Sequence, residues 1–139
     1  MRMWMVAPII MCDRHLYGEH VELHMFLGTF RKHKNVKGYI DNNLLEFKSI
    51  VKRHNVLVYE MKRRMIQNGK KSNHSSFLNE IMVNEFAHSY NDITDIEVNR
   101  LKSSLDLFRR CPICRKRKEK ANLLNIDILD AFLKYDKDF

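Results

Sequence analysis

The scarcity of glycine and proline is the feature that most restricts what this chain can fold into. Only four glycines and two prolines occur in 139 residues. These residues form most tight turns and linkers, so their scarcity favours long helices. No segment alternates between apolar and polar residues as a half-buried strand does. Because 139 residues is also the size of one ordinary domain, we predict a compact, all-α, single-domain helical bundle.

Within this domain, 1-139, the chain divides into three parts. Residues 1-12 are apolar and contain Pro8, which predicts an extended N-terminal arm packed along the first helix. We expect residues 13-110 to form the helical core. We expect residues 111-139 to form a basic C-x-x-C segment followed by a C-terminal helix at 125–135.

Periodicity and capping signals predict three helices in the core. They run from an N-cap at Asp13 to about Lys32, from near Ser49 to Asn68-Gly69, and behind a capping box at residues 94–97. We expect residues 33–43 to form a loop and residues 69–92 to form a long, partly structured connection. The expected core residues of the second helix are Ile50, His54, Leu57 and Met61, and those of the third are Ile96, Leu101, Leu105 and Phe108.

The charge balance points to a polyanionic partner. Lys and Arg number 25 against 17 Asp and Glu, which gives a net charge of +8 and a pI near 9.5. Such a surplus favours nucleic acid over membrane, although a basic protein without such a partner remains an alternative. No apolar run is long enough to span a membrane, no secretory signal is evident, and three cysteines suit a reducing compartment. We therefore expect an intracellular protein.

The first helix has two distinct faces on a helical wheel. Leu16, His20, Leu23, Leu27 and Phe30 form the core stripe, whereas His15, Glu22 and Thr29, with Glu19 and Phe26 between them, form a second face. His20 and His24 lie nearly opposite Glu22, so one metal ion cannot bind all three. Two histidines alone are too few ligands for zinc. We therefore expect hydrogen-bonded histidines and no metal.

The pair Cys111 and Cys114 forms a lone C-x-x-C. A structural zinc needs two further ligands, and no second pair follows in the sequence. Reduced, buried thiols are therefore expected, with a zinc completed by Cys12 or a distant histidine as the alternative. We predict that the chain needs no metal or organic cofactor.

Several segments together resemble the pyrimidine-dimer DNA glycosylase family, to which phage endonuclease V belongs. They are "MRMWMVAPIIMC", "HLYGEHVELHMFLGTFRKH", "GYIDNNLLEFKSIVKRHNVLVYEMKRR" and "NHSS". The resemblance implies an endonuclease V-like helical enzyme that removes a damaged pyrimidine and then breaks the DNA backbone by β-elimination. It also implies that the nucleophile is the α-amino group of Met1, assisted by Glu22, with Arg2 beside the nucleophile.

An α-amine suits this chemistry. Its pKa is about 7.7–8.0 against about 10.4 for a lysine, so a useful fraction is unprotonated at neutral pH. The Schiff base that it forms acidifies the sugar C2′ proton, and a nearby carboxylate can accept that proton. Because Arg2 is too large for efficient removal of the initiator methionine, we expect Met1 to remain.

The resemblance implies double-stranded damaged DNA as the partner of a monomeric enzyme. The expected DNA-binding residues are Arg2, His15, Arg31, Lys32, His33, Arg53, His54, Arg115 and Arg117. The phage enzyme has arginines where this chain has Val21 and Met25, and the basic run "RRCPICRKRKEK" can replace those contacts. The C-terminal residues do not resemble the aromatic tail of the phage enzyme, so the preferred lesion stays open between pyrimidine dimers, other damaged bases and abasic sites.

Two other functions remain alternatives. One is a non-catalytic helical nucleic-acid-binding protein, stabilised by zinc at the C-x-x-C. The other is a metal-dependent nuclease that uses His20 and His24.

Overall fold

The computed structural model describes residues 1–67, 86 and 89–123, and every regular element in these ranges is helical. The α-helices are α1 (Asp13–Arg31), α2 (Lys37–Asp41), α3 (Ile50–Gln67), α5 (Arg100–Arg110) and α6 (Pro112–Leu123). Short 3-10 turns are η1 (Pro8–Ile10), η2 (Phe47–Ser49) and η3 (Asn91–Ile93). The all-α prediction is confirmed. In the described ranges, no helix is both long and apolar enough to cross a membrane.

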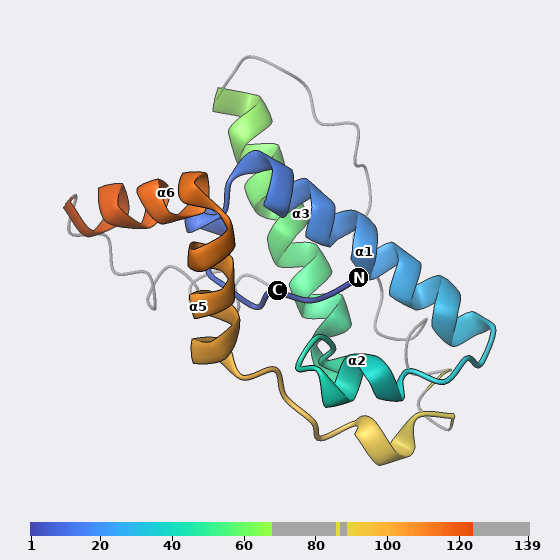
Figure 1. Cartoon of the computed structure of the whole chain (residues 1–139). Helices are drawn as coiled ribbons and strands as arrows, with labels where there is room; N and C mark the ends of the chain where they lie inside the picture. Colours follow the sequence, from blue (N-terminus) through green and yellow to red (C-terminus); the bar gives the residue numbers. More distant parts are fainter. Residues whose placement is uncertain (68–85, 87–88, 124–139) are drawn as a thin grey trace.

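Helices α1 and α3 pack against each other (Figure 1), and their apolar side chains form one core together with those of the N-terminal arm. The predicted apolar residues of the α1 stripe are buried, and so are all four predicted core residues of α3. His20 is only half-buried. Phe30 extends the core toward the following segments, with ring centroids 5.0 Å from both Phe47 and Tyr90.

The start of α1 differs in detail from the prediction. The N-cap is Cys12, whose sulfur accepts the His15 N–H, and Asp13 is instead the first helical residue. The Asp13 carboxylate accepts a hydrogen bond from Arg64 of α3 at 2.7 Å. Asp13 therefore does not cap the helix with its side chain. Its negative charge favours the N-terminal end of the helix dipole, and its ion pair with Arg64 joins this end of α1 to α3.

The predicted loop at 33–43 contains the one-turn helix α2. His33 and Asn43, which follow α1 and α2, have φ values of 52° and 62°. Residues in this left-handed conformation commonly end helices, and glycine usually occupies them. The loop prediction failed because the chain turns twice without glycine, leaving no sequence signal for the short helix.

The prediction for the third helix was wrong in its start and in part of its buried face. Helix α5 begins at Arg100, and its N-cap is Asn99, whose side chain accepts the Lys102 N–H. Leu101 and Leu105 are 71% and 61% exposed, whereas Ser103 and Leu107 are buried and Ile96 and Phe108 are partly buried. The apolar stripe misled the prediction because the face of α5 that packs inward carries Ser103 and Leu107, and periodicity does not show which face another element covers.

The basic C-x-x-C segment forms helix α6, which begins at Pro112 as proline favours. Three predictions fall outside the described residues: the helix stop at Asn68-Gly69, most of the connection at 69–92, and the C-terminal helix at 125–135.

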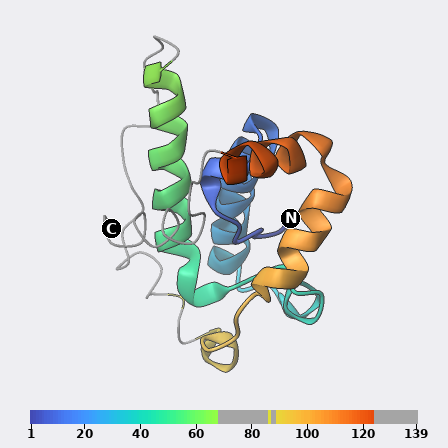
Figure 2. The same ribbon diagram turned by 90° about the vertical axis from the view of Figure 1, so that its left-hand side faces the viewer.

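The N-terminal arm lies between α1 on one side and α5 on the other (Figures 1 and 2). Residues 2–8 are buried, and the Met3 N–H donates to the Leu44 carbonyl at 2.7 Å. The arm therefore packs along α1, as predicted, and its buried side chains also belong to the core. Polar groups of several elements bind its backbone.

Glu46 connects the segment before α3 to the start of α5. Its buried carboxylate accepts hydrogen bonds from the Val98 N–H at 2.9 Å, from Arg100 and from Ser49. Burial raises the pKa of Glu46, but the hydrogen bonds from Arg100, Ser49 and Val98 outweigh it and hold the pKa below its ordinary value. The ionised carboxylate therefore stabilises the fold.

We expect Glu46→Gln to lower the free energy of unfolding at pH 7 by about 2 kcal/mol, because hydrogen bonds to a charged acceptor are lost. A lowered pKa contributes stability above the unfolded-state value and loses it as the pH falls through the folded-state value. The difference between variant and wild type should therefore shrink below about pH 4.

Urea denaturation between pH 3 and pH 7 measures this difference. Glu97→Gln is the matched control, because Glu97 pairs with Lys48 at the exposed surface, where solvent screens the charges and such a pair contributes little to stability. A difference for Glu46→Gln that does not vary with pH would contradict the assignment.

Candidate active site

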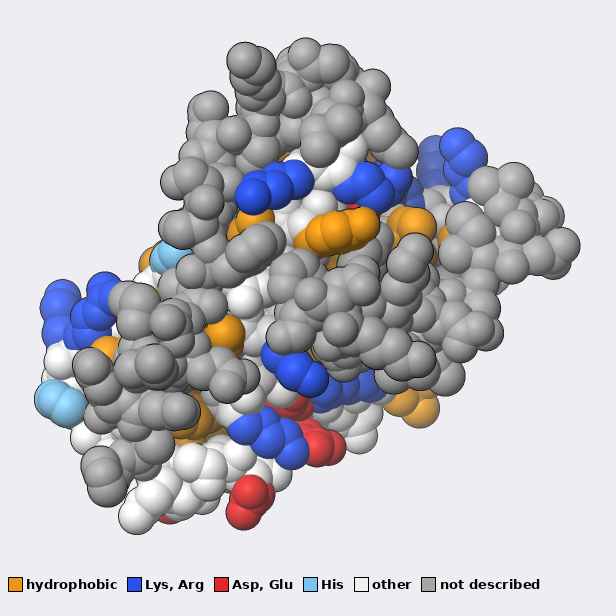
Figure 3. All heavy atoms as spheres, turned by 180° about the vertical axis from the view of Figure 1, so that it is seen from behind, with side chains coloured by type: hydrophobic (Ala, Val, Ile, Leu, Met, Phe, Trp, Pro, Cys, Tyr) orange, Lys and Arg blue, Asp and Glu red, His pale blue; other side chains and the backbone are white. Residues whose placement is uncertain are grey.

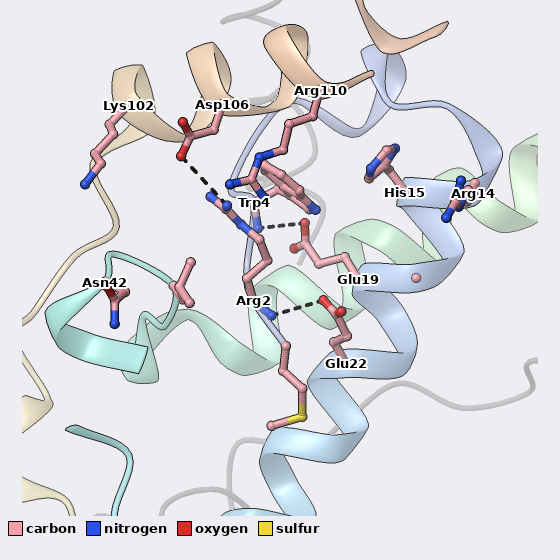
Figure 4. A pocket seen from close by; sticks show the side chains of 13 residues that line it. Arg2, Trp4, Arg14, His15, Glu19, Glu22, Asn42, Lys102, Asp106 and Arg110 are labelled. Carbon is pink, nitrogen blue, oxygen red and sulfur yellow. Dashed lines mark hydrogen bonds and ion pairs between the residues drawn. The ribbon is translucent and has the colours of Figure 1, made fainter. Parts of the chain in front are cut away.

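A pocket of about 660 Å³ opens where the arm passes between α1 and α5. Met1, Arg2 and Trp4 of the arm line it, together with Arg14, His15, Gly18, Glu19 and Glu22 of α1, Lys102, Asp106 and Arg110 of α5, and Asn42 and Leu44 (Figure 4). Its volume lies in the range of ligand pockets. The structure thus places four predicted site residues, Met1, Arg2, His15 and Glu22, around one cavity.

Two glutamates of α1 bind the backbone of the arm. Glu22 Oε2 accepts the Arg2 N–H at 3.1 Å, and Glu19 Oε1 accepts the Trp4 N–H at 2.9 Å (Figure 4). Residues three apart share a helix face, and amides two apart point to the same side of an extended chain. The two spacings match, so α1 sets the register of the arm.

Glu19 is itself held by Arg53 of α3. Arg53 donates to both carboxylate oxygens of Glu19 and also to the Val6 carbonyl at 2.7 Å. Both side chains of this ion pair are at most 1% exposed. The expected role of Arg53 in binding DNA does not fit this place, because a guanidinium enclosed by the core cannot contact a phosphate.

Arg2 connects the arm to α5. Its guanidinium lies 3.6 Å from the centroid of the Trp4 ring, donates to Ser103 Oγ at 3.3 Å and lies 3.8 Å from Asp106. Ser103 in turn donates to the Trp4 carbonyl. Burial lowers the pKa of Arg2, and Asp106 acts in the opposite direction. The side chain forms part of the pocket wall.

The backbone geometry brings the α-amino end of the chain close to a carboxylate. Because Glu22 Oε2 lies 3.1 Å from the Arg2 nitrogen, standard bond lengths place the Met1 nitrogen at most about 7 Å from that oxygen. Glu22 and Met1 are both half-buried and both line the pocket. The first residue and this carboxylate therefore border the same cavity.

Three exposed cations surround the pocket. Arg110 belongs to the basic run that the sequence analysis proposed for DNA contacts, whereas Arg14 and Lys102 were not selected from the sequence. Arg14 comes from α1, and Lys102 and Arg110 come from α5 (Figure 4). Lys102, Asp106 and Arg110 are spaced by four, a signal that could have identified this charged face. Lys and Arg also lie on the opposite surface (Figure 3), so charge alone does not select the side that binds DNA.

The other predicted DNA-binding residues lie away from the pocket lining. Arg31, Lys32 and His33 are exposed at the end of α1, about 14 Å along the helix from Glu22. On α6, Arg115 is exposed, whereas Arg117 is half-buried and donates to the Ile9 carbonyl at 2.9 Å. These positions can extend a DNA surface but do not form the cavity.

His15 lies between the pocket and a group of cysteines. Burial, with a smaller contribution from the Arg14 cation, lowers its pKa. Its Nδ1 is 3.1 Å from Cys12 Sγ and 3.7 Å from Cys114 Sγ, and Cys111 completes the group. These four residues could hold a metal ion.

A second possible metal-binding group joins α1 to α3. His24 Nε2 lies 3.2 Å from His20 Nε2 and 3.0 Å from His54 Nε2. His54 is fully buried, so its place does not fit the expected contact with DNA. The sequence analysis expected His20 and His24 to form hydrogen bonds but did not identify His54 as their neighbour.

A sequence model of the family described as pyrimidine dimer DNA glycosylase matches residues 1–73, more than half of the 139-residue chain. The chain belongs to this family. Comparison with curated proteins and with solved structures gives no match. The matched part of this DNA repair glycosylase contains the arm, α1 and α3, and therefore Met1, Glu19, Glu22 and Arg53. Helix α5, which closes the other side of the pocket, lies beyond it.

We expect the two glutamates that bind the arm to differ in their effect on stability. Glu19→Gln leaves the Arg53 cation buried without a counter-charge and should cost about 3 kcal/mol. Glu22→Gln keeps an oxygen acceptor for the Arg2 N–H in a half-buried place and should cost less than about 1 kcal/mol. Urea denaturation at pH 7 measures both, and equal losses would contradict the assigned roles.

Proposed function

We propose that this protein is a DNA glycosylase and abasic-site lyase that acts on pyrimidine dimers through a Schiff base formed by the Met1 α-amine. The observation that carries the proposal is the hydrogen bond from the Arg2 N–H to Glu22, which holds the chain start beside a carboxylate in an open pocket. Family membership supports the glycosylase activity and damaged DNA as the substrate.

In the first step, the unprotonated amine attacks C1′ of the damaged nucleotide. The N-glycosidic bond breaks, and the base leaves with the bonding electrons and takes up a proton. Loss of a proton from the attacking nitrogen and opening of the sugar ring give an imine between Met1 and C1′. The Glu22 carboxylate stabilises the cationic form of this imine electrostatically.

In the second step, the imine acidifies the proton on C2′. Glu22 accepts this proton, and the C3′–O bond breaks so that the 3′-phosphate leaves by β-elimination. Water then hydrolyses the imine and restores the free amine. Glu22 therefore acts in both steps, as an electrostatic partner and as a base.

The remaining pocket residues bind and position. Glu19, which Arg53 holds from the core side, binds the backbone of the arm. Arg14, Lys102 and Arg110 bind backbone phosphates around the lesion. Reaching C1′ requires that nucleotides leave the stack, which costs a few kcal/mol and is least costly at a damaged site. The pocket beside Met1 is the place where such a nucleotide can enter.

Borohydride reduction traps the imine and tests the mechanism. We expect the untagged protein to form a covalent adduct with a duplex that contains a thymine dimer and with one that contains an abasic site. Mass spectrometry should map both adducts to the α-amine of Met1. Glu22→Gln should lower the trapping rate at least about 100-fold, whereas the surface control Glu97→Gln should leave it unchanged.

The other outcomes separate the alternatives. An adduct on the abasic duplex alone would keep the lyase chemistry and reject dimers as substrate. Cleavage of the DNA strand without a trapped adduct would favour a metal-dependent nuclease whose metal is held by His20, His24 and His54. DNA binding without cleavage or adduct would favour a non-catalytic binding protein. An adduct that forms equally well with an acetylated amino terminus would reject Met1.

The cations around the pocket give a separate prediction for DNA affinity. Lys102→Ala and Arg110→Ala should each weaken DNA binding. Each should also make the slope of log K against log salt concentration less steep, by about 0.9 for each lost phosphate contact. Lys37→Ala is the matched control, because Lys37 is exposed on α2 and does not line this pocket. Fluorescence anisotropy at several salt concentrations measures these slopes, and equal slopes for all three variants would contradict the assignment.

A further inference from the structure

Two pairs of residues from distant parts of the sequence, Cys12 with His15 and Cys111 with Cys114, meet at one point. Cys12 ends the arm, His15 lies in the first turn of α1, and Cys111 and Cys114 lie where α5 meets α6. Their three sulfurs and the His15 ring nitrogen all lie within 4.8 Å of one another. We refer to these four residues as the Cys3His cluster.

We propose that the Cys3His cluster binds one Zn²⁺ ion as a structural site. Three thiolates and one imidazole form a ligand set that structural zinc sites use, with all four tetrahedral positions filled by the protein. The C-x-x-C pair has the spacing of a zinc-binding turn, and the tertiary structure supplies the two ligands that are missing from the surrounding sequence.

The distances within the cluster fit tetrahedral coordination. With Zn–S near 2.3 Å and Zn–N near 2.0 Å, ligand atoms lie about 3.8 Å apart for two sulfurs and about 3.5 Å for sulfur and nitrogen. The Cys12 and Cys111 sulfurs are 3.8 Å apart, and His15 Nδ1 is 3.7 Å and 3.1 Å from the Cys114 and Cys12 sulfurs. Small side-chain shifts are enough to admit the ion.

The backbone around the cluster is arranged for thiolates. The Cys12 N–H donates to Cys114 Sγ at 3.2 Å, the Cys114 N–H to Cys111 Sγ at 3.4 Å, and the His15 N–H to Cys12 Sγ at 3.5 Å. Each of the three sulfurs thus accepts a backbone hydrogen bond. Such outer contacts orient metal ligands and stabilise negative charge on sulfur, whereas a neutral thiol is only a weak acceptor.

The burial of the cluster favours a structural role over a catalytic one. Cys12, Cys111 and Cys114 are at most 7% exposed, and His15 takes the fourth position, so no position remains for a substrate. The 3.8 Å between the Cys12 and Cys111 sulfurs is far longer than the bond of a disulfide. Zinc would connect segments about 100 residues apart, and closing a loop of that length strongly restricts the unfolded chain.

The site also has a consequence for the pocket. The arm leads from Met1 to Cys12, and the His15 ring packs edge-on against Trp4 with centroids 5.6 Å apart. Zinc would therefore hold the end of the arm and the start of α1 against the junction of α5 and α6, which brings the two walls of the pocket together. This role is independent of the reaction proposed for Met1.

The first test is the metal content of the full, untagged chain after expression in zinc-supplemented medium. We expect inductively coupled plasma mass spectrometry to find about one zinc ion per chain. The cysteine thiols should react with Ellman's reagent only after the zinc is released. Replacement by Co²⁺ should give the strong visible absorption of tetrahedral cobalt together with sulfur-to-metal charge-transfer bands. The metal-loaded protein should also melt at a higher temperature than the metal-free protein.

Matched variants locate the ion. Cys111→Ser and Cys114→Ser should lose the charge-transfer bands and most of the zinc, whereas His24→Gln, in the histidine group between α1 and α3, should keep both. His15→Ala should retain the sulfur bands but shift the visible absorption, because water then replaces nitrogen as a ligand.

Three results would overturn the proposal, and none depends on how the variants fold. They are less than about 0.2 zinc per wild-type chain with freely reactive thiols, a disulfide between two of the cysteines, and cobalt spectra without sulfur bands. The last result would place the metal at the histidines. Because these readouts need no DNA, the zinc site and the proposed imine chemistry can each fail without the other.

Discussion

The buried ion pair between Glu19 and Arg53 is the interaction on which the arrangement of the site depends. It joins α1 to α3, and both partners also bind the backbone of the arm, at the Trp4 N–H and the Val6 carbonyl. Between these two contacts, Met5 adopts a φ of 54°, a conformation that costs about 1–2 kcal/mol for a residue other than glycine. The hydrogen bonds on either side offset this cost and hold the bend in the arm.

Burying two charges is an expensive way to join two helices, since apolar residues of similar volume often stabilise a core at least as well. The benefit here is positional. An extended arm whose backbone is buried needs partners for every N–H and C=O group, and Glu19, Glu22, Leu44 and Ser103 provide them at fixed places. A shift of one residue would turn the Arg2 and Trp4 amides away from α1, so only one register satisfies these groups.

The two halves of the chain contribute differently to the pocket. The part that the family model matches contains the arm and the wall of α1, with Met1 and Glu22. Helix α5 forms the opposite wall and adds Lys102 and Arg110, which face the same opening. The Cys3His cluster lies where these halves meet, so a zinc ion there would act on the separation of the two walls and not on the chemistry between them.

The helical class, the extent of α1, the start of α3 and most of the buried residues of these two helices follow from the sequence. A helix repeats every 3.6 residues, and its apolar positions show which side faces a core. The same rule placed Glu22 on the face that the arm covers. It failed for Leu101 and Leu105, since periodicity identifies residues that share a face but not whether another element packs on it.

What only the tertiary structure decided are contacts between residues distant in the chain. It placed Arg53 inside the core, joined His54 to His20 and His24, and brought Cys12 and His15 to the C-x-x-C pair about 100 residues away. Local propensities cannot specify such long-range contacts, because these contacts arise from how whole helices pack. The sequence by itself determined the helical class, the family and the candidate residues Met1 and Glu22, and packing determined which other residues surround them.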